Sequence, residues 1–371
     1  MLSPIKVTHL TSVHPRNDTR IFIKECCSLV NNGYDVNLVV ADGLDYDKCN
    51  GVKIFDVGRL SGRIRRMINT TEAVFKKAVE LNSEIYHFHD PELLAVGLKL
   101  KKNGKTVIYD VHEDVPRQIM GKPYIHKLFK PLISRFIEIY ENRAARKFDA
   151  IITATPYIRN RFLKINKNTM DINNYPIIEE LKNEINWDLK KNEICYIGGI
   201  GEIRGIKEIV RSMEYVKNDI RLNLGGRFSE KKVEIEVKKY KGWSSVNELG
   251  FLDRSKVKDI LSKSKAGLVT LHPVTNYIDA LPVKMFEYMI SGIPVIASDF
   301  PLLREIIGEN NCGLCVNPLD PKDIANAIDY IINNPLEAEQ MAENGQKAVI
   351  EKYNWRLEEK KLINLYERLV K

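Results

Sequence analysis

The chain has 371 residues, of which 44% are hydrophobic and 29% charged, and its formal net charge is +8. This length is too great for one ordinary hydrophobic core and predicts two domains, while the composition excludes a disordered or fibrous protein. No apolar run approaches the ~18 residues that a membrane span needs. The first residues lack the apolar core of a signal peptide, so we expect a cytoplasmic protein.

The positive charge is concentrated in the first half of the chain. Residues 1–178 hold 28 Lys and Arg against 19 Asp and Glu, whereas the remaining residues carry a net charge of −1. Two segments, 61–81 and 121–147, mix basic with bulky apolar residues at helical spacing. Such a surface suits anionic lipid, phosphate or nucleic acid. A merely solvated basic face is the alternative that the sequence leaves open.

The first half alternates short β-rich runs with helical stretches, which is typical of a parallel sheet covered by helices. One helix is predicted over 21–33, where a glycine ends it. The predicted strands of this half are 6–10, 36–41, 53–57, 85–89, 106–112 and 150–155.

A polar, weakly periodic segment over 171–193 predicts a linker, after which the alternation begins again. The last stretch, 353–371, has helical apolar spacing. Two successive α/β domains are expected to hold ligands in a cleft between the carboxyl ends of their sheets. The predicted strands of the second half are 194–199, 221–226, 245–251, 266–271 and 294–298, and the predicted helices are 205–217, 254–264, 282–291 and 321–332.

The segment 272–298, HPVTNYIDALPVKMFEYMISGIPVIAS, carries the densest chemistry. Pro282 is a favoured first residue of a helix. The amides of Val283, Lys284 and Met285 would then be unpaired donors at a helix N-terminus, where a diphosphate can bind. Lys284 adds a full positive charge beside them.

Two acidic residues flank this helix start. Glu287, one turn into the helix, is expected to accept hydrogen bonds from two ribose hydroxyls, and Asp279 is expected on a loop facing the donor sugar. The alternative is an ordinary surface helix, and the density of the pattern disfavours it.

The histidines of the first half lie where predicted strands end. His87 and His89 belong to IYHFHDPELL, and His112 follows TVIYDV. Strand carboxyl ends face the predicted cleft, so these side chains are candidates for the site. A lone histidine is more often structural, and for His89 the two interpretations are equally weighted.

A polar loop follows the first strand and leads into the first helix. His14, Arg16, Asp18 and Arg20 lie within seven residues of one another. We assign this loop to the acceptor or to the donor phosphate. The alternative is that Asp18 is simply the N-cap of the helix.

Three other patterns predict no cofactor. The glycines of YIGGIGEIRG suggest a dinucleotide fingerprint, but the third glycine and a following acidic residue are missing, so a dehydrogenase is disfavoured. The only D-x-D, Asp45 to Asp47, lies in an acidic turn and predicts no metal site. Cys312 and Cys315 form a lone CxxC, which predicts small buried side chains rather than zinc ligands.

The stretch from Pro282 to Ser298 resembles the E-x7-E signature of family 4 glycosyltransferases, which have the GT-B fold with two Rossmann-like domains. The variant it matches is P-x-K-x-F-E-Y-M-x-x-G-x-P-V-I-A-S, of the bacterial polysaccharide-assembly branch. The first acid of the signature is here Asp279 instead of Glu. The resemblance extends over nearly the whole chain, including the polar loop, the two histidine stretches and NNYP at 173–176.

The resemblance implies roles for individual residues. Gly199 takes the place of an arginine, and Arg204 that of a lysine, in a pair that binds the diphosphate. His112 matches a histidine beside the donor sugar, where it would hydrogen-bond the sugar or the developing charge. His89 with Asp90 is similar to an H-x-H-D-P stretch. The leaving group would be stabilised by Arg204, Lys284 and the helix end without a metal.

The family implies a retaining hexosyltransferase with an acceptor-side domain over 1–178, a nucleotide-sugar domain over 179–354 and a last helix, 355–371, that returns to the first domain. We expect a UDP-sugar donor, with GDP-mannose as second choice. The basic first half predicts a lipid-linked glycan acceptor and an anionic membrane partner at the inner face of the cell membrane. Capsule, lipopolysaccharide or exopolysaccharide assembly is the expected setting, without nucleic acid.

Three alternatives stay open from the sequence. A nucleotide-sugar epimerase of the same fold would act on the donor without an acceptor. A glycogen-type synthase would prefer a soluble glucan. A non-enzymatic basic protein that binds membranes or nucleic acid would ignore nucleotide sugars.

Overall fold

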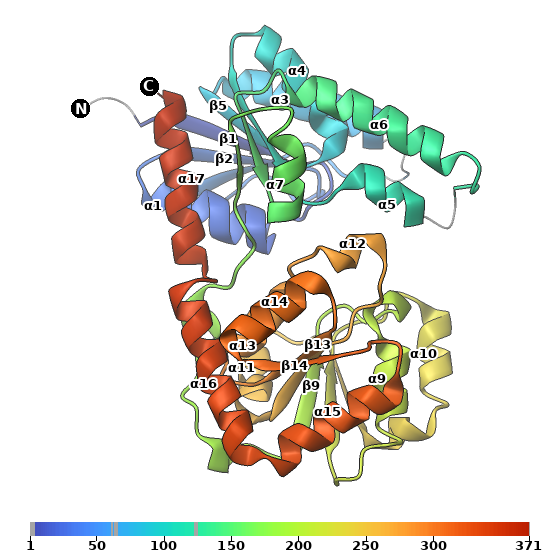
Figure 1. Ribbon diagram of the computed structural model, residues 1–371. Coiled ribbons are helices and arrows are strands. Elements are labelled where there is room, and N and C mark those ends of the chain that lie inside the picture. The colour runs from blue at the N-terminus through green and yellow to red at the C-terminus, as the bar shows by residue number, and fades with distance from the viewer. Residues whose placement is uncertain (1–3, 61, 63–65, 122–124, 371) are drawn as a thin grey trace. The chain divides into compact units, whose positions relative to one another are not determined.

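The computed structural model describes residues 4–60, 62, 66–121 and 125–370 (Figure 1). The chain forms two compact units: unit 1 is Met1–Asn174 with Glu358–Lys371, and unit 2 is Tyr175–Leu357. Parts of the two predicted basic segments, residues 61, 63–65 and 122–124, lie outside the described residues. None of the described helices combines the length and apolarity needed for a membrane span.

Unit 1 is built on an eight-stranded sheet in the order β3-β4-β2-β1-β5-β6-β7-β8, in which β3 alone is antiparallel to its neighbour. All six predicted strands are present within two residues of their predicted ends, whereas the short β3 and β8 were not predicted. The strands are β1 (Lys6–Leu10), β2 (Asp35–Val40), β3 (Asp47–Cys49), β4 (Val52–Asp56), β5 (Ile85–Phe88), β6 (Thr106–Val111), β7 (Ala150–Thr153) and β8 (Thr169–Asp171).

The first helix of unit 1 differs from its prediction. It begins at Thr19 as a π-helix instead of at residue 21, because Asp18 accepts hydrogen bonds from the amides of Arg20 and Ile21, both at 2.9 Å. The helices of unit 1 are η1 (Thr19–Cys26), α1 (Cys27–Asn31), η2 (Arg66–Thr70), α3 (Thr71–Leu81), η3 (Pro91–Leu93), α4 (Leu94–Lys102), α5 (Val115–Gly121), α6 (Lys130–Ala145), α7 (Pro156–Phe162) and α17 (Trp355–Val370), which enters unit 1 at Glu358.

The two faces of the central strands of unit 1 differ in polarity. Side chains alternate between faces along a strand, so Tyr86 and Phe88 lie with α3, α4 and α6 in an apolar core. His9 and His87 belong to the opposite face and are paired in register. There η1 and α17 cover a buried polar layer, and Tyr366 of α17 contacts His87 with 2.8 Å between its hydroxyl and Nδ1.

Unit 2 is a six-stranded parallel sheet in the order β11-β10-β9-β12-β13-β14. The five predicted strands are present, and β14 was not predicted. The strands are β9 (Glu193–Ile197), β10 (Arg221–Gly225), β11 (Val246–Gly250), β12 (Ala266–Val269), β13 (Val295–Ser298) and β14 (Gly313–Val316).

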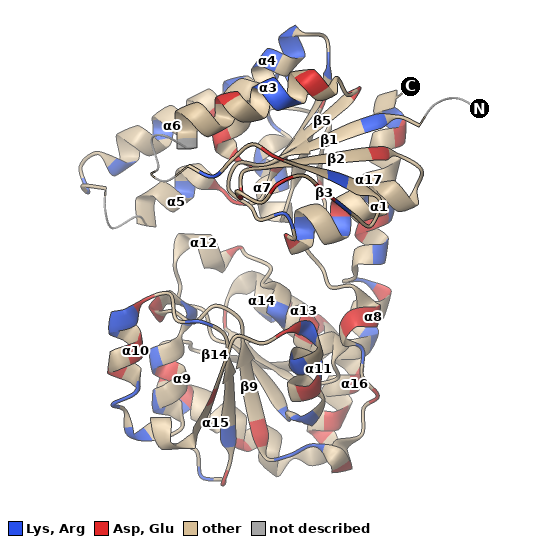
Figure 2. Cartoon of the chain, turned by 180° about the vertical axis from the view of Figure 1, so that it is seen from behind, with Lys and Arg blue, Asp and Glu red and all other residues tan. Residues whose placement is uncertain are grey.

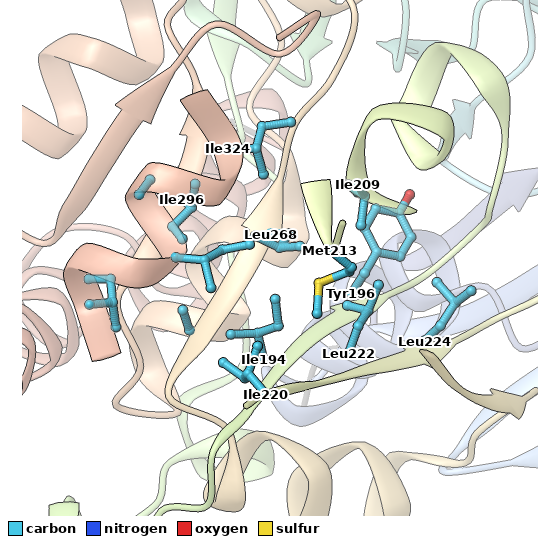
Figure 3. Close-up of a cluster of buried hydrophobic side chains, with 14 of the residues drawn as sticks. Ile194, Tyr196, Ile209, Met213, Ile220, Leu222, Leu224, Leu268, Ile296 and Ile324 are labelled. Carbon is cyan, nitrogen blue, oxygen red and sulfur yellow. The ribbon is translucent and has the colours of Figure 1, made fainter. Parts of the chain in front are cut away.

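Both faces of the unit 2 sheet are apolar. Ile194 and Tyr196 contribute to one core (Figure 3), and Cys195 between them contributes to the other. Near-continuous apolar strands of this kind are typical of a parallel sheet covered on both faces. The helices of unit 2 are α8 (Ile178–Leu181), η4 (Trp187–Leu189), η5 (Glu202–Arg204), α9 (Ile206–Ser212), α10 (Lys231–Val237), η6 (Lys241–Ser245), α11 (Arg254–Lys263), α12 (Thr275–Ile278), α13 (Val283–Ile290), α14 (Pro301–Asn310), α15 (Pro321–Asn333) and α16 (Pro335–Glu351).

The predicted linker over 171–193 is a folded part of unit 2 from Tyr175 onward. Leu181 of α8 is fully buried, and Trp187 is nearly so, each within one of the two cores. These apolar residues are too far apart in the sequence to show the periodicity of a helix or a strand. The linker prediction is therefore wrong for most of this segment.

Candidate functional site

Each unit brings polar residues together where its strand order reverses. In unit 1, β1 lies between β2 and β5, and in unit 2, β9 lies between β10 and β12. At such a point the loops after two neighbouring strands separate, and ligands of open α/β sheets bind there. The loop after β1 holds His14, and the loop after β9 holds Gly198 and Gly199.

In unit 2, the loop after β9 contacts the start of α13. Gly198 has φ of +133°, and a Cβ built on it would stand 3.3 Å from Lys284 Nζ. A side chain there would strain the backbone and crowd the ammonium group. The glycine thus keeps open the space around Lys284.

Lys284 has a buried ammonium group without a hydrogen-bond partner among the described residues. Its Nζ lies 3.5 Å from the centroid of the Tyr196 ring. Burial, followed by the charge of Arg204, lowers the pKa of Lys284 to about 7. A buried cation in this state gains strongly from an anion, so the group fits a phosphate.

Arg204 ends η5 on the same loop. Its Nη1 donates to the carbonyl of Gly199 at 3.3 Å, and the hydroxyl of Tyr196 donates to that carbonyl at 2.7 Å. Gly205 follows with φ of +80°, where a Cβ would stand 2.0 Å from the Thr270 carbonyl. Only glycine fits this turn, which brings the arginine back beside Lys284.

The helix start at α13 differs in detail from its prediction. Pro282 is the N-cap, with ψ of 116°, and Val283 is the first helical residue. The amide of Met285 donates to the carbonyl of Pro282 at 2.9 Å, so this predicted free donor is used within the turn. The amides of Val283 and Lys284 belong to the first turn of the helix, where anions are favoured.

Of the two acidic residues of the predicted signature, Glu287 lies one turn from Lys284 on α13 and is paired with an arginine. Glu287 Oε1 accepts from Arg254 Nη1 at 2.8 Å, and Arg254 also donates to Glu180 at 2.6 Å. Asp279 follows α12, and partial burial raises the pKa of its carboxyl group. Arg254 was not singled out from the sequence, because a residue 33 positions from Glu287 gives no local signal.

In unit 1, Asp110 is the centre of the polar layer. Arg20 binds it in a bidentate pair at 2.8 and 2.9 Å, and His89 Nδ1 lies 3.0 Å from its Oδ2. Although burial opposes ionisation, the charge of Arg20 holds the pKa of Asp110 well below its ordinary value. Asp110 was not singled out from the sequence. Its place in β6, two residues before His112, is the signal that could have found it, because side chains two apart in an extended chain point the same way.

His112 follows β6 as predicted. Its Nε2 lies 2.8 Å from Asp110 Oδ2, and its side chain is 18% exposed. The carboxylate fixes the ring orientation and leaves Nδ1 for a ligand. His112 thus combines a fixed imidazole with access to solvent.

His14 and Asp18 lie beside His112. The rings of His14 and His112 are 5.1 Å apart, and His14 Nδ1 lies 3.4 Å from Asp18 Oδ2. Burial opposes protonation of His14, but this contact with Asp18 raises the pKa of the imidazole. Asp18 is also the N-cap of η1, which is the alternative that the sequence left open.

The other three candidates of unit 1 are engaged within the protein. Arg16 forms a bidentate pair with Asp42 at 2.8 and 2.9 Å, and Arg20 is buried against Asp110. His89 is buried, and burial lowers its pKa to about 4. These residues therefore position others and offer little surface to a ligand. Asp47, predicted in a turn, begins β3 and lies 3.6 Å from Arg16.

A cavity of about 640 Å³ opens beside His112 within unit 1. Its lining has a polar side, with His14, Glu92 and His112, and an apolar side made by α5, α6 and Ile125 between them in the sequence. The apolar side chains are Val115, Ile119, Ile125, Ile133 and Ile137. A ligand with a sugar-like end and a hydrocarbon end matches this division.

Comparison with known proteins finds a glycosyltransferase family pattern in each half of the chain. The sequence pattern of the family described as Glycosyltransferase Family 4 matches residues 23–170, and that of Glycosyl transferases group 1 matches residues 177–348. An uncharacterized glycosyltransferase of Methanocaldococcus jannaschii is 23% identical over an alignment of 376 positions, gaps included, which covers 91% of each chain.

Solved structures share the fold of this chain. Sucrose-phosphate synthase of Thermosynechococcus elongatus has a TM-score of 0.80 at 17% identity over 99% of each chain. Anabaena HepE, solved with UDP and glucose, has a TM-score of 0.74 at 12% identity over 98% of this chain and 100% of that one. The chain is therefore a glycosyltransferase of the family 4 type with the GT-B fold.

Proposed function

We propose that the protein transfers a hexose from a UDP-sugar to a lipid-linked glycan, with retention of anomeric configuration, in cell-surface glycan assembly. The observation that carries the donor half of this proposal is the buried, unpartnered Nζ of Lys284 among the described residues. A nucleoside diphosphate supplies the anion that this ammonium group lacks. HepE, solved with UDP and glucose, supports a nucleotide sugar as the donor.

The chemistry follows from the leaving group. Breaking the bond from the sugar to the diphosphate leaves negative charge on the phosphate oxygen. In the proposal, Lys284, Arg204 and the amides of Val283 and Lys284 stabilise this charge in place of a divalent ion. Glu287 binds the ribose hydroxyls, Asp279 the donor sugar, and His112 the transferred sugar through its free ring nitrogen.

The acceptor half rests on the cavity of unit 1. Its polar side suits the hydroxyl groups of a glycan, and its apolar side suits the lipid that carries the glycan. A soluble glucan would gain nothing from the isoleucine side chains of α6.

A surface of unit 1 supports a membrane setting at the inner face of the cell membrane. Exposed apolar side chains follow one another at helical spacing along α6, with Leu132 at 68% and Phe136 at 71% exposure. α6 also carries Lys130, Arg135 and Arg143 together with Glu138 and Glu141 (Figure 2). Exposed apolar side chains with cations on the same helix are typical of a surface that lies on anionic lipid.

The donor is tested with a panel of nucleotide sugars. We expect UDP-sugars to raise the melting temperature, because a ligand that binds the folded state alone stabilises it. Transfer is then measured on a lipid-linked acceptor. Stabilisation by GDP-mannose alone would correct the base, donor turnover without acceptor would indicate an epimerase, and no shift with any nucleotide would overturn the proposal.

Membrane binding is tested by co-sedimentation with anionic vesicles. We expect binding that weakens as salt rises and that falls in Leu132→Ser and Phe136→Ser. Leu336→Ser is the matched control, since Leu336 of α16 in unit 2 is also highly exposed. Binding that is indifferent to lipid charge, or absent at low salt, would favour a soluble acceptor instead.

A further inference from the structure

Three histidines surround one glutamate in the buried polar layer of unit 1. Glu25 Oε2 lies 3.9 Å from His9 Nδ1, 4.0 Å from His87 Nδ1 and 3.9 Å from His89 Nε2. All four side chains are fully buried. These distances are too long for hydrogen bonds, and they are nearly equal.

Hydrogen bonding within the described residues leaves Glu25 without a partner, although His9 Nδ1 and His89 Nε2 lie within hydrogen-bond distance of each other at 2.9 Å. Neither oxygen of Glu25 accepts a hydrogen bond, and Nε2 of His87 has no partner. Arg20 Nε lies 3.2 Å from Glu25 Oε1, but it donates to Asp110 instead. Buried polar groups are almost always hydrogen-bonded, so the set calls for an explanation.

We propose that His9, Glu25, His87 and His89 bind a divalent transition-metal ion of the zinc class. Imidazole nitrogens with one carboxylate are a usual ligand set for such an ion. Two donors about 2.1 Å from a tetrahedral ion stand about 3.4 Å apart. The His9–His89 pair, at 2.9 Å, and the three Glu25 pairs bracket this value, and the four ligand atoms lie within 4.8 Å of one another.

The surroundings have the form of a second ligand shell. His89 Nδ1 lies 3.0 Å from Asp110 Oδ2, and the hydroxyl of Tyr366 lies 3.4 Å from His9 Nε2. A metal-binding histidine usually donates its other N–H to a carboxylate or another oxygen. The ion would tie η1, β1 and β5 together and, through Tyr366, hold α17 against them. Its role is structural and separate from the proposed donor site of unit 2.

The metal content of the purified full-length protein tests the proposal. We expect about one zinc-class ion per chain, retained when native protein is dialysed against EDTA and lost when the chain is unfolded in EDTA. Refolding with Co²⁺ should give the visible absorption of a tetrahedral site. Refolding without metal should lower the melting temperature by several degrees. The proposal would be overturned if the wild-type protein holds no metal and if its spectrum and melting temperature do not respond to Co²⁺ or Zn²⁺ on refolding.

Variants locate the ion. Glu25→Gln and His9→Gln should lose it, whereas His272→Gln should retain it, since His272 forms an imidazole–carboxylate pair with Glu208 at 2.8 Å in unit 2. A metal retained by both cluster variants lies elsewhere and contradicts the assignment. So does a metal that is lost in His112→Ala and kept in Glu25→Gln, which would place it at the neighbouring set of His89, Asp110 and His112.

Discussion

The two units treat their buried charges in opposite ways. In unit 1, the charge of Arg20 is balanced by Asp110 at 2.8 Å. In unit 2, the ammonium group of Lys284 is buried without a hydrogen-bond partner among the described residues. A buried charge is costly unless it is paired. The cost of burying Arg20 in unit 1 is therefore met within the protein, while that of burying Lys284 in unit 2 is left to be met by a ligand.

This difference separates two kinds of residue. A change in the paired network of unit 1 leaves a second charge buried and alone, so its main effect is on stability. A change at Lys284 removes a charge that has no hydrogen-bond partner in the described part of the chain, so its main effect is on binding. His112 lies at the boundary, because it contacts Asp110 and is also accessible to solvent.

The largest effect is expected from His112→Ala. Transfer should fall by roughly 10²-fold or more, the scale of one lost electrostatic contact in the transition state. The affinity for UDP should stay unchanged, because UDP is assigned to unit 2. Asp110 keeps Arg20 and His89 as partners, so the melting temperature should change little. Steady-state kinetics, calorimetry and a melting curve check the three expectations.

Asp110→Asn provides the contrast within unit 1. It leaves Arg20 buried beside a neutral partner, so we expect a loss of stability on the scale of about 3–5 kcal/mol for breaking a buried pair. Near-normal transfer by a folded His112→Ala would remove His112 from the site. A destabilised His112→Ala with unchanged turnover would place it in the paired network.

The second effect concerns Glu287 in unit 2. Glu287→Ala should weaken UDP binding by about 1–3 kcal/mol, because the lost hydrogen bonds involve a charged acceptor. Calorimetry measures the affinity. Stability should hold, since the pair with the half-exposed Arg254 is a surface ion pair.

Arg254→Ala separates the two roles of that pair. If Glu287 contacts the ribose itself, the Arg254 variant should bind UDP more tightly than Glu287→Ala does. Equal losses in the two variants would mean that Glu287 acts only through Arg254. Unchanged affinity in Glu287→Ala would exclude it from the nucleotide site.

The fold was predictable because both halves repeat one local pattern. Eleven strands were predicted from runs such as VNLVV and GLVTL, and each is parallel to at least one neighbouring strand. The missed strands β3 and β8 have three residues each, too few to form a period, and the missed β14 has four. The predicted linker failed because the burial of Trp187 depends on tertiary contacts that leave no local signal.

The site was predictable in part. Lys284 lies at the start of a helix and His112 at the end of a strand, and both positions can be predicted from the local sequence pattern. Whether a side chain faces a ligand or another part of the protein depends on long-range partners. Arg16 pairs with Asp42, which lies 26 residues away, and Arg20 with Asp110, which lies 90 residues away. The sequence therefore could not separate ligand-facing cations from paired ones.

The third effect is the uptake of a proton by Lys284 when UDP binds. Its folded pKa of about 7 lies below the ~10.4 of an unfolded lysine. The folded, ligand-free protein thus binds fewer protons than the unfolded chain between those pH values. The Lys284 contribution to stability is most unfavourable below pH 7 and vanishes as pH rises past ~10. A bound diphosphate favours the charged form and raises this pKa.

UDP binding at pH 8 to 9 should therefore take up close to one proton, and affinity should fall by at most tenfold per pH unit. Calorimetry in buffers of different ionisation enthalpy counts the protons. Lys284→Arg keeps its charge throughout this range and should bind without uptake. Wild-type binding without proton uptake would place the diphosphate away from Lys284.

The smallest expected effect is that of EDTA. If Lys284 and Arg204 stabilise the leaving diphosphate, transfer by the native protein should be unchanged when EDTA is present during the assay. The proposed ion of unit 1 does not alter this expectation, because its four ligands are fully buried and it should exchange only on unfolding. Initial rates with and without EDTA measure the effect, and the metal content of the same sample shows whether the buried ion has stayed. Activity that EDTA abolishes while the melting temperature holds, and that manganese restores at once, would mean that unit 2 binds its diphosphate through an ion. The unpaired lysine would then no longer distinguish the two units.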